Sequence, residues 1–234
     1  MQPFLVFGLS ASIGAMGEIA GNKRRGTLTW PLRSALIGLM GAAMGIERNG
    51  DFSVLDRLVV DVAIFHLGNS LQDYHTVETI PEIGAGKNSM FETSRSNQLQ
   101  MVAAKDKNTF LTSRDYVTDV FYGISVSGSG IEEVSSALRR PSFPLCLGRK
   151  SCSLSAPTGA RIVNAETSEM ALAHIQAPPW LGMSLRSNIM VSDCDEMTPG
   201  REIVHDRIID RTHRHFGIRY VVLKPVDIVL GGVS

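Results

Sequence analysis

The spacing of hydrophobic and polar residues predicts a strand, a helix and a second strand in the first part of this chain. Residues 3–9 form an apolar, strand-like run, and residues 57–65 are again apolar and rich in β-branched side chains. Between them, residues 31–46 carry apolar side chains at the 3.6-residue period of one buried helical face. These positions are Leu32, Ala35, Leu36, Leu39, Met40 and Ala43. Pro31 fits the first turn of this helix, where its missing N–H costs nothing.

A further strand and helix follow after a long insertion. Alternate positions of residues 116–126 predict one face of a single strand; they are Tyr116, Thr118, Val120, Tyr122, Ile124 and Val126. A Ser-Gly turn at 127–130 ends this strand, and residues 131–138 resemble a short helix. The order of elements predicts an α+β fold with a ferredoxin-like sheet, an architecture that RNA-recognition modules often use.

The insertion itself, residues 78–113, is rich in glycine and serine, with cations spread along it and little apolar period. Loops of this length inside a domain are usually functional or disordered. We therefore expect a mobile hairpin, or thumb, that projects from the sheet. The alternative is a surface insertion without a role.

Composition sets the outer limits on function. With 234 residues and 44% hydrophobic content, the chain is long enough to bury a core. The longest apolar stretch, residues 35–46, is too short for a membrane helix, and no signal peptide is visible, so we expect a cytoplasmic protein without membrane contact. Cys146, Cys152 and Cys194 form no C-x-x-C pair, which favours reduced thiols.

Charge adds a more specific signal, because two windows contain cations and no carboxylate. Residues 134–165 hold five basic side chains in a net-neutral protein, around an irregular loop that contains Pro141, Pro144 and Gly148. Residues 19–46 hold only Lys23, Arg24, Arg25 and Arg33. Arg33 lies in the first helical turn, where backbone N–H groups already favour an anion such as phosphate. The alternatives are a solvated basic loop and an Arg33 that pairs with a distant carboxylate.

Four short motifs occur in the order found in one known family. They are residues 32–42, residues 72–77, residues 113–119 and residues 147–154. On these motifs, most of residues 1–155 resembles the CasD family, subunits of the type I-E CRISPR surveillance complex Cascade and members of the repeat-associated mysterious protein superfamily. After about residue 158 the resemblance is thin.

The resemblance implies a ferredoxin-like palm at residues 1–77 and 114–155, a thumb at 78–113 and a small β-rich C-terminal part at 156–234. It implies a non-catalytic RNA-binding subunit that holds the 5′ handle of the CRISPR RNA in antiviral defence. The implied neighbours are a CasC-type backbone subunit and a CasA-type large subunit, with target DNA engaged indirectly through the complex. The family motifs fall on Arg33, Ser34, Tyr74, His75, Gly148, Arg149, Lys150 and Ser151.

The chain departs from the family pattern in its first strand and the turn after it. An expected arginine is replaced by Gly8, and a tryptophan-containing turn by residues 14–17. A cation and a stacking indole are thus missing, and Lys23, Arg24 and Arg25 are candidates to compensate as RNA backbone contacts.

Combining both lines of reasoning gives a set of predicted RNA-binding residues and no predicted cofactor. The set is Lys23, Arg24, Arg25, Arg33, Ser34, Tyr74, His75, Arg95, Lys105, Lys107, Arg114, Tyr116, Arg139, Arg140, Gly148, Arg149, Lys150 and Ser151. We predict no metal site, because His205, His213 and His215 with Cys194 lack zinc-like spacing and suit a surface cluster. Phosphate contact by residues 211–214 is a further option.

Two other functions remain open at the level of sequence. The first is metal-independent cleavage of repeat RNA by Tyr74 and His75 with Lys105 or Lys107. Adjacent residues of a strand point to opposite faces, which disfavours this site. The second is a cap that binds mainly protein.

Overall fold

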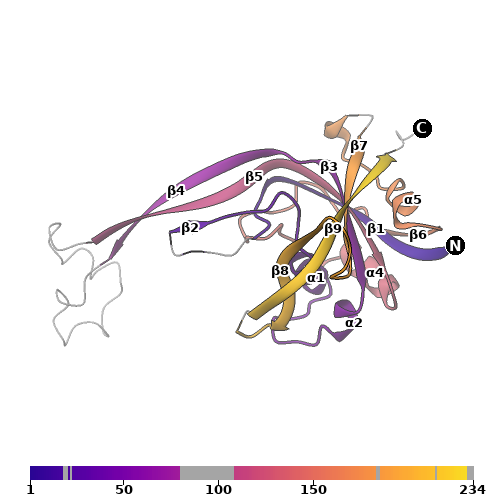
Figure 1. Ribbon diagram of the computed structural model, residues 1–234, viewed down its shortest axis with the longest axis horizontal. Coiled ribbons are helices and arrows are strands. Elements are labelled where there is room, and N and C mark those ends of the chain that lie inside the picture. The colour runs from indigo at the N-terminus through magenta and orange to yellow at the C-terminus, as the bar shows by residue number, and fades with distance from the viewer. Residues whose placement is uncertain (18–20, 22, 80–107, 183–184, 214, 231–234) are drawn as a thin grey trace.

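The computed structural model describes residues 1–17, 21, 23–79, 108–182, 185–213 and 215–230, which form a mixed α/β fold around a large, mostly antiparallel sheet (Figure 1). The strand order is β6-β1-β5-β3-β7-β9-β8, and β2 and β4 pair with β5 outside this path. The strands are β1 (Gln2–Gly14), β2 (Arg24–Arg25), β3 (Val59–His66), β4 (Asn69–Thr79), β5 (Asn108–Ser127), β6 (Arg161–Ala165), β7 (Arg186–Asp193), β8 (Arg201–Asp210) and β9 (His215–Val229). The helices are α1 (Arg33–Ala43), α2 (Ser53–Asp56), α4 (Ile131–Arg139), α5 (Ser168–Leu172) and the 3₁₀ turn η2 (Pro179–Leu181).

The predicted first helix and its flanking strands are confirmed, with shifted ends. Helix α1 begins two residues after Pro31, which therefore precedes the helix and does not lie in its first turn. Strands β1 and β3 both pair antiparallel with β5, so they run in the same direction with β5 between them. Helix α4 then leads from β5 to β6, which pairs with the other edge of β1. The chain thus builds two interleaved strand-helix-strand units.

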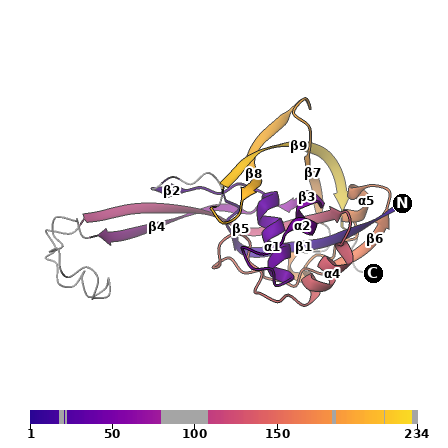
Figure 2. The same ribbon diagram turned by 90° about the horizontal axis from the view of Figure 1, so that it is seen from below.

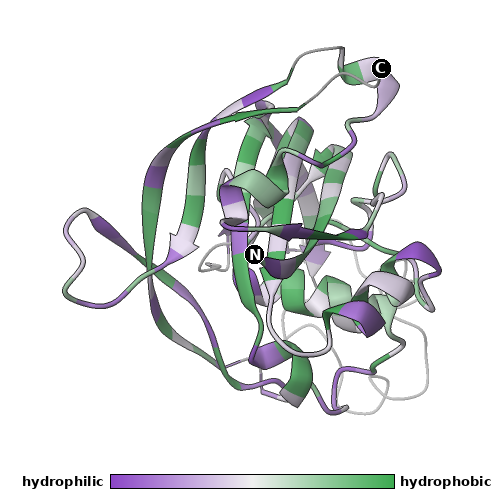
Figure 3. Cartoon of the chain, turned by 90° about the vertical axis from the view of Figure 1, so that its right-hand side faces the viewer, coloured by the Kyte–Doolittle hydropathy of each residue, from purple (hydrophilic) through white to green (hydrophobic). Residues whose placement is uncertain are grey.

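Helices cover both faces of the central strands. On one face α1 and α4 pack against Leu5, Leu9 and Tyr122, and the predicted apolar stripe of α1 is largely buried there. On the other face α5 packs against Phe65 and Phe121. Figure 3 shows the resulting concentration of hydrophobic (green) positions in the middle of the sheet.

The predicted alternation along β5 is wrong at its N-terminal end. Asp119 has a φ of +55°, and this backbone conformation interrupts the regular alternation of side chains. Val117 is therefore buried in the same core cluster as Val120, while Tyr116 and Thr118 are not. This break releases Tyr116 from the core and makes it available to the surface described below.

Strands β4 and β5 form a long antiparallel hairpin that extends well beyond the rest of the described chain (Figures 1 and 2). Pairing begins at Asn69 and Thr118 and continues to Thr79 and Asn108. The predicted start of the thumb at residue 78 thus falls inside β4. Residues 80–107, with the candidates Arg95, Lys105 and Lys107, lie outside the described residues.

The C-terminal strands continue the same sheet past β3. Strand β7 pairs with β3, β9 with β7, and β8 with β9, and the β8–β9 hairpin approaches α1 (Figure 2). The three cysteines are free thiols, as predicted. Among the described residues, no helix combines the length and the apolar character needed to cross a membrane.

Candidate nucleic-acid interface

Strand β2 brings the first predicted cations to the root of the β4–β5 hairpin. Its two residues pair in parallel with β5, so that Arg24 lies opposite Ser113 and Arg25 lies opposite Arg114. The backbone N–H of Ser113 also donates to the carbonyl of Lys23 over 2.8 Å. A segment that is distant in sequence is thereby fixed beside the hairpin.

The predicted irregular loop after α4 reaches the same place. The N–H of Ala15 at the end of β1 donates to the carbonyl of Leu147 over 3.1 Å. Gly148 follows with a φ of +89°, and a Cβ at this position would lie 1.6 Å from the carbonyl oxygen of Ala15. Only glycine permits this approach, which places Arg149 and Lys150 directly after the contact.

Arg149 joins the loop to both strands. Its guanidinium donates to the carbonyls of Arg25 and Asp115, over 3.3 and 3.4 Å, and its Cζ lies 4.5 Å from the centre of the Tyr116 ring. We call the resulting group the cationic cluster. It consists of Lys23, Arg24, Arg25, Arg114, Arg149 and Lys150.

Most of this cluster is uncompensated. Within the described part of the chain, no side-chain partner is found for Lys23, Arg25, Arg114 or Lys150. Arg24 differs, because it forms an ion pair of 2.6 Å with Asp115. Hydrogen bonds from Arg24 and then from Gln72 hold the pKa of Asp115 below its usual value. Asp115 lies within the motif at residues 113–119, but it was not among the predicted RNA-binding residues, because the charge pattern indicated cations only.

Tyr74 and His75 lie on β4 beside this cluster, but on opposite faces of the hairpin. Tyr74 pairs with Ser113, and its side chain is 61% exposed. Its hydroxyl donates to Oε1 of Gln72. His75 pairs with Thr112, and its Nε2 lies 2.6 Å from a carboxylate oxygen of Asp73. The strand geometry thus separates the two side chains that an RNA-cleaving site would need to bring together.

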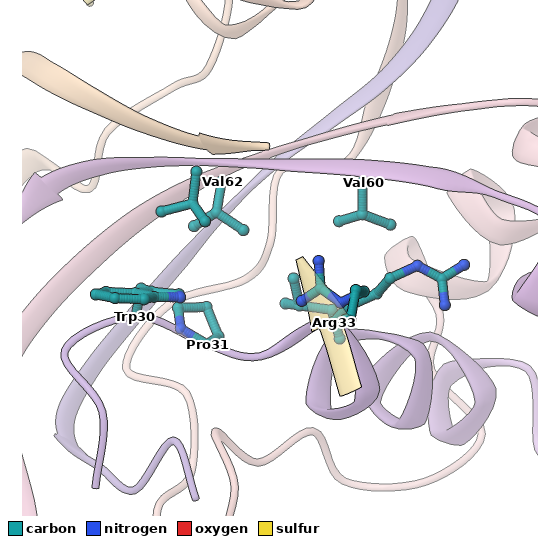
Figure 4. A pocket seen from close by; sticks show the side chains of 8 residues that line it. Trp30, Pro31, Arg33, Val60 and Val62 are labelled. Atoms are coloured by element: carbon teal, nitrogen blue, oxygen red, sulfur yellow. The ribbon is translucent and has the colours of Figure 1, made fainter. Parts of the chain in front are cut away.

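Arg33 is engaged within the protein. Its guanidinium donates to the carbonyls of Asp56 and Leu58, over 2.7 and 2.9 Å, and lies 4.0 Å from Asp193. Figure 4 shows Arg33 and Trp30 beneath Val60 and Val62 of β3, in a small pocket. The pocket is lined by Trp30, Pro31, Arg33, Leu36, Val60, Val62, Val191 and Arg219.

The N-terminus of α1 already has an anion of its own. The N–H of Ser34 donates to the buried carboxylate of Asp206 over 3.4 Å. The open alternative for Arg33, pairing with a carboxylate distant in sequence, thus receives structural support. RNA contact by Arg33 and Ser34 stays a prediction, because both groups already have partners within the protein.

Arg139 and Arg140 lie elsewhere. Arg139 donates to the carbonyl of Ala160 and to Ser135, and Arg140 is exposed. The segment that follows them is bonded to the C-terminal end of α1, through Ser142 and Ala43. Since α1 has 11 residues, it is about 16 Å long, so these arginines and Arg33 flank opposite ends of a helix. Among the described residues, the predicted cations therefore form three separate groups.

The C-terminal histidines form no metal site among the residues that the structure describes. His213 forms an ion pair with Asp210 at 2.7 Å, and its ring centre lies 5.7 Å from that of His215. Arg211 pairs with Asp56 and lies over the ring of Phe52, which leaves it poorly placed for phosphate.

Comparison with known proteins gives a consistent picture. A family model described as "CRISPR-associated protein (Cas_Cas5)" matches residues 4–222. The "CRISPR system Cascade subunit CasD" of Escherichia coli (strain K12) is 26% identical over 193 residues, which cover 75% of this chain and 78% of that protein.

Two solved structures share the fold. "CRISPR RNA-guided surveillance complex" matches with a TM-score of 0.68 and 21% identity, over 97% of this chain and 91% of that chain. "Crystal structure of Cas protein" matches with a TM-score of 0.64 and 22% identity, over 96% and 95%. Because the family model spans nearly the whole sequence, this chain belongs to the Cas_Cas5 family of CRISPR-associated proteins, and the family predicted from its motifs is confirmed.

Proposed function

We propose that this protein is a non-catalytic, RNA-binding subunit of a type I-E Cascade complex and that it holds the 5′ handle of the CRISPR RNA. The relationship to a Cascade subunit from E. coli supports the complex. The strand order β6-β1-β5-β3, with α1 and α4 on one face, supports a ferredoxin-like palm. We expect the complex to act in the cytoplasm, beside CasC-type and CasA-type subunits.

The cationic cluster carries this proposal. Four of its side chains have no partner within the described chain, and Arg149 stacks on Tyr116. Uncompensated cations beside the exposed ring of Tyr74 are a combination that suits single-stranded RNA, since phosphates need charge and bases need stacking surfaces. Arg33, Arg139 and Arg140 contribute less, because all three lie away from the cluster, at opposite ends of α1.

The salt dependence of RNA binding tests the proposal. If Lys23, Arg25, Arg114, Arg149 and Lys150 each neutralise one phosphate, log K against log salt falls with a slope near −3.5, at roughly −0.7 per phosphate of a single strand. The measurement uses the full chain and a labelled RNA that carries the 5′ handle. A slope near zero, or no binding, contradicts the proposal.

A double substitution makes the test specific to the cluster. Replacing Arg25 and Lys150 by alanine should reduce the slope to about −2. The matched control replaces two exposed cations away from the cluster, Arg48 in the turn between α1 and α2 and Lys224 on β9, and removes the same charge. Equal effects of the two pairs would indicate a general charge effect without a defined interface.

The placement of Tyr74 and His75 on opposite faces of the hairpin supports the proposal that the subunit does not cleave RNA. Incubation of the pure protein with repeat RNA in the presence of a chelator is expected to leave the RNA intact. Site-specific cleavage that is lost in His75→Ala would establish the endoribonuclease instead.

A protein-binding role for the hairpin is also supported by a specific observation. Phe110 is 51% exposed and Leu111 is 61% exposed on adjacent positions of β5, and hence on opposite faces of the hairpin. Apolar side chains of this size on both faces suit burial against a neighbouring subunit. We therefore propose that the outer hairpin contacts protein while its root contacts RNA.

A further inference from the structure

We propose that Asp115 is a positioning residue for RNA, which holds one guanidinium and one aromatic ring in place for a single nucleotide. The inference rests on the proposed RNA-binding function and assigns a role to an acidic residue inside a cationic interface. Such a residue is unexpected there, because a carboxylate repels the phosphates of RNA.

The Asp115 carboxylate connects three strands. Asp115 lies on β5 and is only 7% exposed. Its Oδ2 accepts from Nε of Arg24 on β2 over 2.8 Å and from Nη2 over 2.6 Å. Its Oδ1 accepts from the amide of Gln72 on β4 over 3.0 Å. Both carboxylate oxygens are therefore used to fix side chains of neighbouring strands.

The connection continues to an exposed ring. Gln72 uses its amide nitrogen for Asp115 and its carbonyl oxygen for the hydroxyl of Tyr74. Gln72 is directly opposite Asp115 in the hairpin, and Tyr74 lies two residues further along β4, so the three side chains share one face. That orients the Tyr74 ring through a chain of hydrogen bonds that begins at the buried carboxylate.

The two ends of this chain provide different chemistry. The Arg24 side chain is 69% exposed, and its planar guanidinium suits a phosphate. The Tyr74 ring is exposed and suits stacking with a base. Long side chains lose conformational freedom on binding, and holding them in place beforehand lowers that cost. The arrangement is thus preorganised for the phosphate and the base of one nucleotide.

Substitution of Asp115 by asparagine separates positioning from simple charge. Asp115→Asn removes a negative charge next to RNA, so electrostatics alone predicts tighter binding. Positioning predicts the opposite, about tenfold weaker binding of handle RNA. Asp119→Asn is the matched control, since it removes the same charge from the same strand at an exposed site and asparagine tolerates its positive φ. This control should bind RNA at least as tightly as the wild type.

Coupling to Arg24 provides the second readout. Arg24→Ala should weaken binding in the wild type and have little further effect in Asp115→Asn, because the charged contact that positions the guanidinium is already lost there. Additive effects of the two substitutions would overturn the inference. So would an Asp115→Asn protein that binds RNA as tightly as the wild type or more tightly.

Tyr74→Phe keeps the test decisive if Asp115→Asn does not fold. Tyr74 is exposed, and the substitution retains the ring while removing the hydroxyl that Gln72 holds. Binding about threefold weaker supports positioning, and unchanged binding contradicts it. Failure of the wild type to bind RNA is a separate result that overturns the proposed function itself.

Discussion

The carboxylate of Asp206 accepts hydrogen bonds from Nε and Nη2 of Arg219, over 2.7 and 2.8 Å, at the place where the β8–β9 hairpin meets α1. Asp206 is almost completely buried, and one of its oxygens also accepts from the N–H of Ser34 at the first turn of α1. A single carboxylate thus compensates a guanidinium and the positive end of a helix dipole. The C-terminal hairpin is thereby attached to the helix that covers the central sheet.

Replacing Asp206 by alanine should lower the free energy of unfolding by about 3 kcal/mol, because Arg219 is left partly buried, with Asp193 as its remaining partner among the described residues. Urea denaturation followed by circular dichroism measures this change. The control is Asp227→Asn, which breaks the exposed pair between Asp227 and Arg186 and should have no measurable effect. An equal loss of stability in both variants would show that the buried contact stabilises the protein no more than the exposed one does.

Arg33→Ala tests whether this arginine stabilises the fold or contacts an RNA phosphate. Loss of its hydrogen bonds to the carbonyls of Asp56 and Leu58 should destabilise the protein by about 2 kcal/mol. The slope of RNA binding against salt should stay unchanged, since no phosphate contact is removed. A slope that becomes less steep by about 0.7 would instead assign a phosphate to Arg33.

The intramolecular contacts of Arg33 show which features the sequence could predict and which it could not. The period of α1 and the apolar runs of β1 and β3 are local, and they predicted these elements with errors of a few residues. The absence of acidic residues near a cation in the sequence is also a local feature. Whether that cation pairs with a carboxylate in the folded protein is not. Asp193 and Asp206 are more than 150 residues from Arg33 and Ser34, and only the packing of β7 to β9 brings them close. No window of sequence contains that information.

The interface at the root of the hairpin was predictable in part for the same reason. Gly148, before Arg149 and Lys150, correctly indicated an irregular loop, and its φ of +89° is an observation of the structure. The parallel pairing of β2 with β5 depends on two residues only, which is too short for any periodicity to reveal. The contact between Asp115 and Arg24 depends on that pairing, and the position of Tyr116 outside the core depends on the backbone conformation of Asp119.

Gly148→Ala should be much more harmful than Gly159→Ala. Both glycines have positive φ, so each substitution strains the backbone by about 1 kcal/mol. At Gly159 nothing lies within 4 Å of the added Cβ, whereas at Gly148 the Cβ would collide with the carbonyl of Ala15. The loop must then move, and RNA affinity should fall at least tenfold in Gly148→Ala alone. Anisotropy titrations of both variants with handle RNA compare them, and equal affinities would separate this loop from the interface.

Acid should weaken the root of the hairpin through Asp115. Its pKa in the folded protein is lowered by hydrogen bonds from Arg24 and Gln72, while the unfolded chain has a value of about 3.9. The unfolded state therefore binds the proton first, and the contribution of Asp115 to stability is complete above that value and is lost as pH falls below it. Wild type should be more stable than Asp115→Asn at pH 6, and the difference should shrink towards pH 3. Urea midpoints of both proteins at pH 6, 4.5, 3.5 and 3 measure this, with the remaining carboxylates common to both. A difference that is independent of pH would mean that the carboxylate is not held in its charged form by Arg24.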